Sequence, residues 1–413
     1  MSAAPKYAGG SKARYLLLGA TVYLVLLGLV MVYSASSVSG YIMFEDSMYH
    51  LKRHALFLGV GLLLMVLSQA VDYRKLSLLA WPFLGVCLVA LVLVLVTGSE
   101  VWGATRWLDL GFITVQPSEY AKLASLLVAA LLLSQWRAGI IEAKQLAIRL
   151  LLVFSAVASL VMLQPDMGTT VIIAASIYLV LVLGRVSAAL LAGMTALGAV
   201  GAFALMFLAS YREERVLAFR DPWADPLGSG YQSIQAMLAF GSGGVDGLGV
   251  GMSKQKFSYL PAAHTDFIFA IIGEELGLIG SLSVVLAFGV ITYAGFRIAF
   301  GSKDMFGRLV AGGLTGTIVI QAIINMAMVV GLMPVTGKPL PLVSYGGTAM
   351  TLTLICIGVI LSVSSHGASG RATVRAPVRK KEHRSAHMDE RRRDGGAHIS
   401  GTGRRRSASA RRT

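Results

Sequence analysis

The sequence has little charge and little cysteine for its length. Only 14% of its 413 residues are charged, whereas 55% are hydrophobic, and the mean hydropathy is +0.71. An average soluble domain carries about 25% charged residues, so the composition excludes that class and indicates a membrane protein. The two cysteines, Cys87 and Cys356, lie inside apolar runs, far from any second Cys or His at ligand spacing. We therefore expect them to be core residues, with no disulfide and no metal ion.

Long apolar runs make up most of the chain between Tyr15 and Ser365. Runs of about 18 residues or more can cross a bilayer as helices, and these runs lack the alternation of barrel strands. The proline of Gln164-Pro165-Asp166 divides one run into two, because proline cannot donate inside a helix. The fold predicted is an all-α integral membrane protein with ten transmembrane helices, near 15–34, 52–71, 77–97, 117–135, 147–163, 168–184, 187–209, 265–296, 308–331 and 345–365.

Lysine and arginine near the helix ends predict the orientation. They concentrate on the side that holds both termini, which is therefore expected to be cytoplasmic. The opposite, extracytoplasmic side carries two long segments, roughly 98–119 and 210–264, the larger between the seventh and eighth helices. Connections of this length are usually functional or disordered, and their aromatic residues suit an ordered layer at the membrane surface.

The net charge of +15 is mostly a property of the C-terminal segment. Residues 367–413 contain 14 Lys and Arg against 4 Asp and Glu, which is +10. This segment has almost no apolar residues, so we expect a disordered cytoplasmic tail that binds anionic lipid rather than nucleic acid. The predicted organisation is a cytoplasmic N-terminal segment 1–14, a transmembrane domain 15–366 and this tail.

Few ionisable residues lie in or against the predicted helices, where charge is costly. Glu119 and Lys122 are spaced to share one helix face, which fits a stabilising ion pair as well as a substrate contact. For Glu274 and Glu275 we favour a buried polar contact between helices over a catalytic role.

Asp266 opens the eighth predicted helix and has two readings. It can be a first-turn acid that complements the helix dipole, with Thr265 as a possible N-cap. Alternatively it is a partly desolvated carboxylate whose pKa rises towards a value useful to a general base. On the same side, the glycines of 241–251 could cradle a phosphate with main-chain donors, and Lys256 and Arg106 could supply positive charge.

Six motifs in order along the chain resemble the SEDS family (shape, elongation, division and sporulation). They cover nearly all of residues 15–365 and read GATRWLDLG from Gly103, QPSEYAK from Gln116, QPDMGT from Gln164, GYQSIQAMLAFGSGG from Gly230, YLPAAHTDFIFAIIGEELG from Tyr259 and GLMPVTGKPLPLVSYGG from Gly331. The stretch FRDPWADPLGSGYQ from Phe219 and the basic tail are more similar to the FtsW-like division branch than to the RodA-like elongation branch. The chain departs from the family pattern at Lys338, where an apolar residue is usual, and at Thr348-Ala349.

The resemblance implies a peptidoglycan glycosyltransferase that polymerises lipid II at the outer face of the bacterial cytoplasmic membrane, at the division septum. Its essential carboxylate falls on Asp266. Further substrate-binding positions are implied at Arg106, Trp107, Glu119, Lys122, Gln235, Lys256, His264, Thr265 and Ser344, and packing positions at Glu274, Glu275, Pro334, Gly337, Gly346 and Gly347.

The implied reaction joins a sugar hydroxyl to C1 of a lipid-linked sugar with inversion, so one base suffices and no protein nucleophile is needed. Arg106 and Lys122 are candidate partners of the leaving pyrophosphate, with a divalent ion, Mg or Mn, as a further option, and an apolar groove would hold the polyprenyl chain. The implied partners are lipid II, the growing glycan, a class B penicillin-binding transpeptidase and other division proteins. The alternatives are a lipid II flippase, an elongation-type polymerase, and a scaffold in which Asp266 would have no chemical task.

Overall fold

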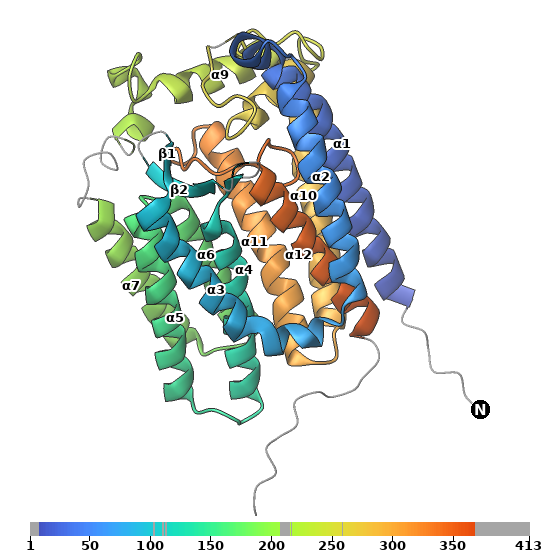
Figure 1. Ribbon diagram of the computed structural model, residues 1–413, viewed down its shortest axis with the longest axis vertical. Helices are drawn as coiled ribbons and strands as arrows, with labels where there is room; N and C mark the ends of the chain where they lie inside the picture. Colours follow the sequence, from blue (N-terminus) through green and yellow to red (C-terminus); the bar gives the residue numbers. More distant parts are fainter. Residues whose placement is uncertain are drawn as a thin grey trace, which may run out of the picture. The chain divides into compact units, whose positions relative to one another are not determined.

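The computed structural model describes residues 8–101, 104–109, 111, 114–206, 215, 217–257 and 259–367. All of them belong to one unit of the chain, 1–373. Long helices run side by side in this unit, and a small sheet, a shorter helix and irregular segments gather at one end of them (Figure 1). The predicted basic tail lies outside the described residues, apart from Gly367.

The described part of the chain contains ten helices of 17 to 37 residues. They are α1 (Ala8–Phe44), α2 (Tyr49–Ala70), α3 (Leu76–Thr97), α4 (Pro117–Arg137), α5 (Ala143–Leu163), α6 (Met167–Leu183), α7 (Ala188–Met206), α10 (Ile268–Gly301), α11 (Met305–Val329) and α12 (Gly347–His366). Each overlaps one predicted range, and α5 and α6 are separated at Gln164-Pro165 as proline chemistry predicts.

Seven of these helices are long and apolar enough to cross a membrane, judged within the described residues. They are α1, α2, α3 (with the preceding turn from Tyr73), α5, α10, α11 and α12. Helix α6 is apolar but shorter. The predicted all-α membrane architecture is confirmed. The number of helices that cross and the orientation of the bundle remain predictions.

The segment between α3 and α4 contains a small antiparallel sheet that the sequence analysis did not predict. Strands β1 (Ser99–Val101), β2 (Ala104–Asp109) and β3 (Thr114–Val115) pair in the order β1-β2-β3. Glu100 pairs with Thr105, and Leu108 pairs with Val115. The strands are rich in Val, Thr and Trp, which favour extended backbone, but each is too short to give a periodic signal in the sequence.

The larger segment, between α7 and α10, contributes helix α9 (Tyr231–Gly243) and the 3-10 turn η2 (Pro222–Ala224); a second such turn, η1 (Tyr73–Lys75), precedes α3. After α9 the chain runs back along α10, whose helical backbone is interrupted at Gly277, with φ 65° and ψ −160°. The interruption frees main-chain groups, so Leu248 N donates to Glu274 O at 2.9 Å and Leu278 N donates to Gly244 O at 3.0 Å. Non-helical backbone of this kind is tolerated because protein groups satisfy it.

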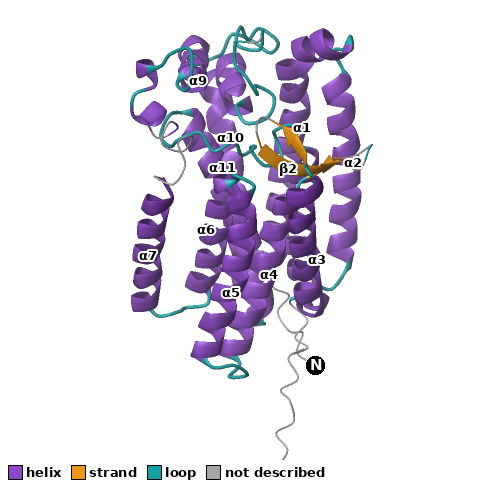
Figure 2. Cartoon of the chain, turned by 60° about the vertical axis from the view of Figure 1, so that its left-hand side comes forward, coloured by secondary structure: helices purple, strands orange, loops and turns teal. Residues whose placement is uncertain are grey.

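The two ends of the bundle differ in character. At one end Arg14 Nη1 donates to Ser365 Oγ at 3.2 Å, so the start of α1 lies beside the end of α12. The sheet, α9 and the loops around them gather at the opposite end, and α7 stands at the edge of the bundle (Figure 2). Core residues of α4, α10, α11 and α12 are buried between these ends. A functional site is therefore expected at the irregular end of the bundle.

Candidate active site

Asp266 lies in the turn that leads into α10, at the irregular end of the bundle. Its side chain is mostly buried, and no described residue donates a hydrogen bond to its carboxylate. Gly337 lies against it, since a Cβ at that position would be 3.6 Å from Asp266 Oδ2. The helix itself begins at Ile268 and has no side-chain cap. Thr265 Oγ1 instead donates to Ala262 O at 3.1 Å. The reading of Thr265 as an N-cap is therefore wrong.

Asn325 of α11 joins the Asp266 turn to the segment 331–346 between α11 and α12. Its Nδ2 donates to the main-chain oxygens of Asp266 and of Lys338, each at 2.7 Å. The side-chain nitrogen of Asn325 therefore hydrogen-bonds the main chains of both segments. The arrangement fixes the Asp266 turn relative to Lys338.

Lys338 forms a buried ion pair with Asp166, which lies between α5 and α6. The Nζ to Oδ2 distance is 2.8 Å, and the two side chains are 3% and 1% exposed. Asp166 caps α6 by accepting Thr169 N at 3.0 Å and Thr169 Oγ1 at 2.8 Å, and Gln116 Nε2 donates to it at 3.3 Å. A buried pair needs such additional hydrogen bonds, because its Coulomb attraction alone rarely offsets desolvation.

Arg106, on β2, ties the sheet to the same turn. Its Nε donates to Gln164 O at 3.0 Å and its Nη2 donates to Pro165 O at 2.5 Å. The turn that carries Asp166 is therefore held from the sheet by Arg106 and from the 331–346 segment by Lys338.

The two carboxyl groups of this cluster have opposite pKa shifts. Burial raises the pKa of Asp266 from 3.8 to about 6, although the positive charges of Lys338, Arg215 and Arg106 oppose the rise. Burial also acts to raise the pKa of Asp166, but the charge and hydrogen bond of Lys338, helped by the charge of Arg106, outweigh it and hold this pKa at about 2. At neutral pH both carboxylates are ionised, and Asp266 is the one poised to take up a proton.

His264 and Thr265 are attached to the 331–346 segment through their main chains. Ser344 Oγ donates to Thr265 O at 2.6 Å and accepts Leu340 N at 2.8 Å, and Tyr345 N donates to His264 O at 2.9 Å. These bonds hold the segment that precedes Asp266.

Two histidines of α2 face the same segment and were not singled out from the sequence. The His50 and His264 rings are 4.7 Å apart, and the His54 ring is 6.1 Å from that of Tyr345. Both ring nitrogens of His50 and of His54 are buried without a hydrogen-bond partner. Burial, together with the charge of His50, lowers the pKa of His264 to about 4, so this ring is neutral at pH 7.

Glu119 and Lys122 form a buried ion pair inside the bundle. The Lys122 Nζ to Glu119 Oε2 distance is 2.8 Å, and the same Nζ donates to Gln321 Oε1 at 2.7 Å. Gln321 Nε2 in turn donates to Pro339 O at 3.0 Å. Gln321 thus links the pair to the 331–346 segment. Of the two readings that the sequence left open, the contacts are those of an ion pair.

Glu274, Glu275 and Lys256 form a second buried cluster, away from Asp266. Glu275 accepts Ser34 Oγ at 2.6 Å and pairs with Lys256 Nζ at 3.4 Å. Glu274 accepts Ser253 Oγ at 2.5 Å and Lys254 N at 2.9 Å. The cluster holds the segment after α9 on α10 and α1.

The remaining predicted positions are spread over the irregular end. Trp107 lies on β2, where it pairs with Ser99 of β1. Gln235 lies on α9, and Pro334 lies in the 331–346 segment. Gly346 and Gly347 lead into α12, where a Cβ on Gly347 would come within 2.7 Å of the Phe57 ring.

The described residues contain no group of three or more His, Cys, Asp or Glu side chains that could hold a metal ion. The carboxylate of Asp166 already forms an ion pair with Lys338. The described side chains therefore form no metal cage of their own, whereas Mg²⁺ commonly binds one or two carboxylates together with substrate phosphates, so the Mg or Mn option stays a prediction.

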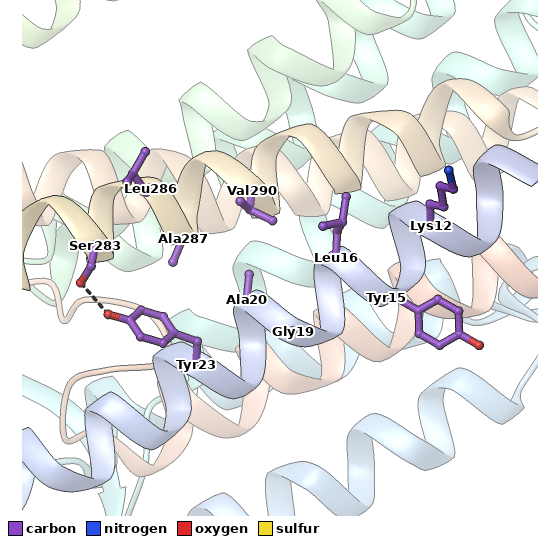
Figure 3. A pocket seen from close by; sticks show the side chains of 10 residues that line it. All are labelled: Lys12, Tyr15, Leu16, Gly19, Ala20, Tyr23, Ser283, Leu286, Ala287 and Val290. Carbon is purple, nitrogen blue, oxygen red and sulfur yellow. Dashed lines mark hydrogen bonds between the residues drawn. The ribbon is translucent and has the colours of Figure 1, made fainter.

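An apolar groove of about 660 Å³ runs between α1 and α10 (Figure 3). Tyr23 and Ser283 close one end through a 2.5 Å hydrogen bond, and Lys12 lies at the other. Among the α10 residues that line the groove, Ser283 is the nearest to Asp266 in sequence, and it lies 15 residues after the start of the helix, beyond the interruption at Gly277. Asp266 is not among the residues that line the groove, and the expected polyprenyl groove stays a prediction.

Besides the two histidines of α2, three residues of the site were missed by the sequence analysis. Asp166 appeared only as part of a family motif, although Asp three residues before Thr169 is an N-cap signal. Lys338 was noted only as a departure from the family pattern, and Asn325 lies within an apolar run. Their roles depend on contacts between segments far apart in the sequence.

Comparisons with known proteins bear on the family to which the chain belongs. The family model described as "Cell cycle protein", which covers FtsW, RodA and SpoVE, matches residues 14–369. The chain is 42% identical to stage V sporulation protein E of Bacillus subtilis over 351 residues, 84% of this chain and 95% of that protein. It is 40% identical to the protein named "Probable peptidoglycan glycosyltransferase FtsW" of Trichlorobacter lovleyi over 356 residues, 83% of this chain and 91% of that one.

A solved structure of a peptidoglycan synthase complex contains a chain with the same fold. The match has a TM-score of 0.71 and 32% identity, and it covers 86% of this chain and 98% of that chain. That complex is described as coordinating polymerization and crosslinking. From the family match, the identities and the shared fold together, the chain belongs to the SEDS family of FtsW, RodA and SpoVE, as a multi-pass membrane protein.

Proposed function

We propose that this protein is a peptidoglycan glycosyltransferase that polymerises lipid II into β-1,4-linked glycan during septal cell-wall synthesis. Several relatives that are 37% to 40% identical carry the name of such an enzyme of the FtsW type. The similarity to a sporulation relative and to a synthase complex supports a role in cell-wall synthesis more generally. The elongation-type role is the nearest alternative.

The observation that carries the proposal is the state of Asp266. Its carboxylate is mostly buried, accepts no hydrogen bond from the described residues and has a pKa raised to about 6. A general base must be ionised at the working pH yet able to hold a proton, and a pKa near 6 meets both needs. Asp166 does not, because Lys338 holds it ionised.

In the proposed reaction the 4-hydroxyl of a GlcNAc residue attacks C1 of the lipid-linked sugar. The new C1–O bond forms as the C1–O bond to undecaprenyl pyrophosphate breaks, and the bonding pair leaves with the pyrophosphate. Asp266 takes the hydroxyl proton, which typically contributes about 10² to 10⁴ in rate. One displacement inverts C1, so no covalent intermediate on the protein is required.

The charges around Asp266 suit a reaction with an anionic leaving group. Arg106 and Arg215 lie near enough to lower the pKa of Asp266 by their charge, and Arg215 Nη1 also donates to Val335 O at 2.9 Å. A positive field fixed before the reaction stabilises negative charge that develops on the departing pyrophosphate. Lys122, the other cation considered from the sequence, is paired with Glu119 and is not among the cations whose charge acts on Asp266, so Arg106 is the better candidate.

A class B penicillin-binding transpeptidase is the proposed partner. The support is the similarity to a chain of a synthase complex that joins polymerization to crosslinking. Glycan made by this protein would then be crosslinked by the partner. We propose the division septum of the cytoplasmic membrane as the location.

The proposal is tested by measuring glycan formed from lipid II by the purified protein with its transpeptidase partner. Asp266→Asn should lower the rate by about 10² or more, whereas Asp246→Asn, which removes an exposed carboxylate, should not. Full polymerisation by Asp266→Asn, in a preparation free of other polymerases, would rule out the base. A wild type that moves lipid II across vesicles without making glycan would favour the flippase.

A further inference from the structure

Lys338 is a buried cation that pairs with Asp166 and whose charge also acts on Asp266. The residue is 2% exposed, and its Nζ is 2.8 Å from Asp166 Oδ2. Room for its side chain depends on Gly168, since a Cβ there would lie 2.9 Å from Lys338 Cε. The lysine stem is thus enclosed, and its ammonium has little freedom to move away.

The backbone of Lys338 is fixed relative to Asp266. Asn325 Nδ2 binds the main-chain oxygens of both residues, and the neighbouring Gly337 lies against the Asp266 carboxylate. At Gly337 φ is +67°, a conformation that favours glycine, so the close approach is built into the chain. Lys338 is held in place by its side chain and by its main chain.

The charged groups that face Asp266 come from four other elements. They are Lys338 from the 331–346 segment, Arg106 from β2, Arg215 from the segment before α9, and the carboxylate of Asp166. His264, on the same turn as Asp266, is neutral at pH 7.

Among these cations Lys338 has the largest effect in lowering the pKa of Asp266. It is also buried, whereas Arg215 is exposed and Arg106 is partly exposed. Water and salt screen an exposed charge much more than a buried one. The Asp166 carboxylate, which faces Asp266 as a like charge, offsets only part of the effect.

We propose that Lys338, locked onto Asp166, is a positioning residue that supplies the fixed positive charge keeping Asp266 in the ionised form that accepts the proton. The inference rests on the proposed function, in which Asp266 is the base. Asp166 has the matching task of holding the ammonium in place. Neither residue needs to touch the substrate.

The test is the pH dependence of kcat/KM for lipid II polymerisation by the full chain with its partner. Lys338→Met should move the acid limb to higher pH, so that the rate near pH 5 falls about tenfold for each pH unit of displacement while the rate near pH 8 is largely kept. Lys338→Arg keeps the charge and should restore the limb towards the wild-type position.

The double variant Lys338→Met/Asp166→Asn removes both charges of the pair, so that position 166 is not left with a buried carboxylate that has lost its cation. This variant keeps the test informative if Lys338→Met alone does not fold. The acid limb of its kcat/KM profile should also move to higher pH, but by less than in Lys338→Met. A limb at the wild-type position in the double variant, with the protein folded and active, would overturn the inference. If the limb moves but Asp266→Asn still polymerises fully, it is the assignment of the base that fails.

Discussion

At the scale of single residues, the ionised form of Asp266 is unfavourable for folding. A carboxyl group whose pKa is raised from 3.8 to about 6 holds its proton more tightly in the folded protein than in the unfolded chain. The stability linked to that proton is fully present below the ordinary pKa and is lost as the pH rises through 6. At pH 7.5 the cost is up to about 3 kcal/mol, at 1.36 kcal/mol per pKa unit.

We therefore predict that Asp266→Asn makes the protein more stable at pH 7.5. The thermal midpoint in detergent or nanodiscs should be higher than that of the wild type, and the difference should shrink as the pH falls from 7.5 towards 4. Asp246→Asn is the control, because Asp246 is exposed. An Asp266→Asn protein that is less stable at pH 7.5 would contradict the burial of this charge.

The sequence predicted this carboxylate and the positive charge of Arg106 on the same side, but not the pair of Lys338 and Asp166. An acidic residue at the start of an apolar helix can be recognised in the sequence as partly desolvated. The family resemblance then favoured the interpretation of Asp266 as the essential carboxylate. Lys338 and Asp166 are separated by 172 residues, so their ion pair depends on how α6 packs against the 331–346 segment. Lys122 was considered as a pyrophosphate partner because the implied reaction needs a cation, and the i,i+3 spacing fitted an ion pair with Glu119 as well as a substrate contact.

At the scale of elements, hydropathy predicted the long helices well and the irregular elements poorly. Each of the ten helices contains a long apolar run, which is a strong hydropathy signal in the sequence. The three short strands and the interruption of α10 give none, because they depend on pairing with other parts of the chain. These elements are the ones that shape the end of the bundle where Asp266 lies.

The interruption of α10 should depend strictly on Gly277. In Gly277→Ala the new Cβ would lie 2.3 Å from Val245 O, and φ would remain at an unfavourable +65°. A strained backbone of this kind costs about 1–3 kcal/mol even without the clash, so the thermal midpoint should fall. Gly289→Ala is a matched control on the same helix, because nothing lies within 4 Å of its Cβ. Equal effects of the two variants would show that the interruption is not needed.

The ion pair of α4 should behave as a buried structural pair. Lys122→Met leaves Glu119 buried without its cation and should destabilise the protein by about 3–5 kcal/mol. The double variant Lys122→Met/Glu119→Gln should recover much of this loss, as seen in thermal unfolding. If the double variant is stable but binds lipid II much more weakly than the wild type, the pair contacts substrate after all.

At the scale of the whole molecule, the described unit has two unlike ends. The start of α1 and the end of α12 meet at one end, and the candidate site lies at the other. The expected orientation puts the site outside the cell, where lipid-linked sugars would be polymerised, and the termini in the cytoplasm.

Single-cysteine labelling tests this orientation. Asp246 lies in the exposed segment after α9, and Lys144 lies exposed at the start of α5. In intact cells a membrane-impermeant thiol reagent should label Asp246→Cys but not Lys144→Cys, and permeabilised cells should allow both. The native Cys87 and Cys356 are buried and should give little background. The reverse pattern would invert the proposed topology.

The most direct test of the account is the pH dependence of kcat/KM for lipid II polymerisation by the wild-type protein with its partner. A base with a pKa of about 6 predicts an acid limb centred near pH 6, with activity rising tenfold per pH unit below it and levelling above it. A limb near pH 4, where an ordinary Asp titrates, or a rate independent of pH between 5 and 8, would contradict the claim that a desolvated Asp266 is the base.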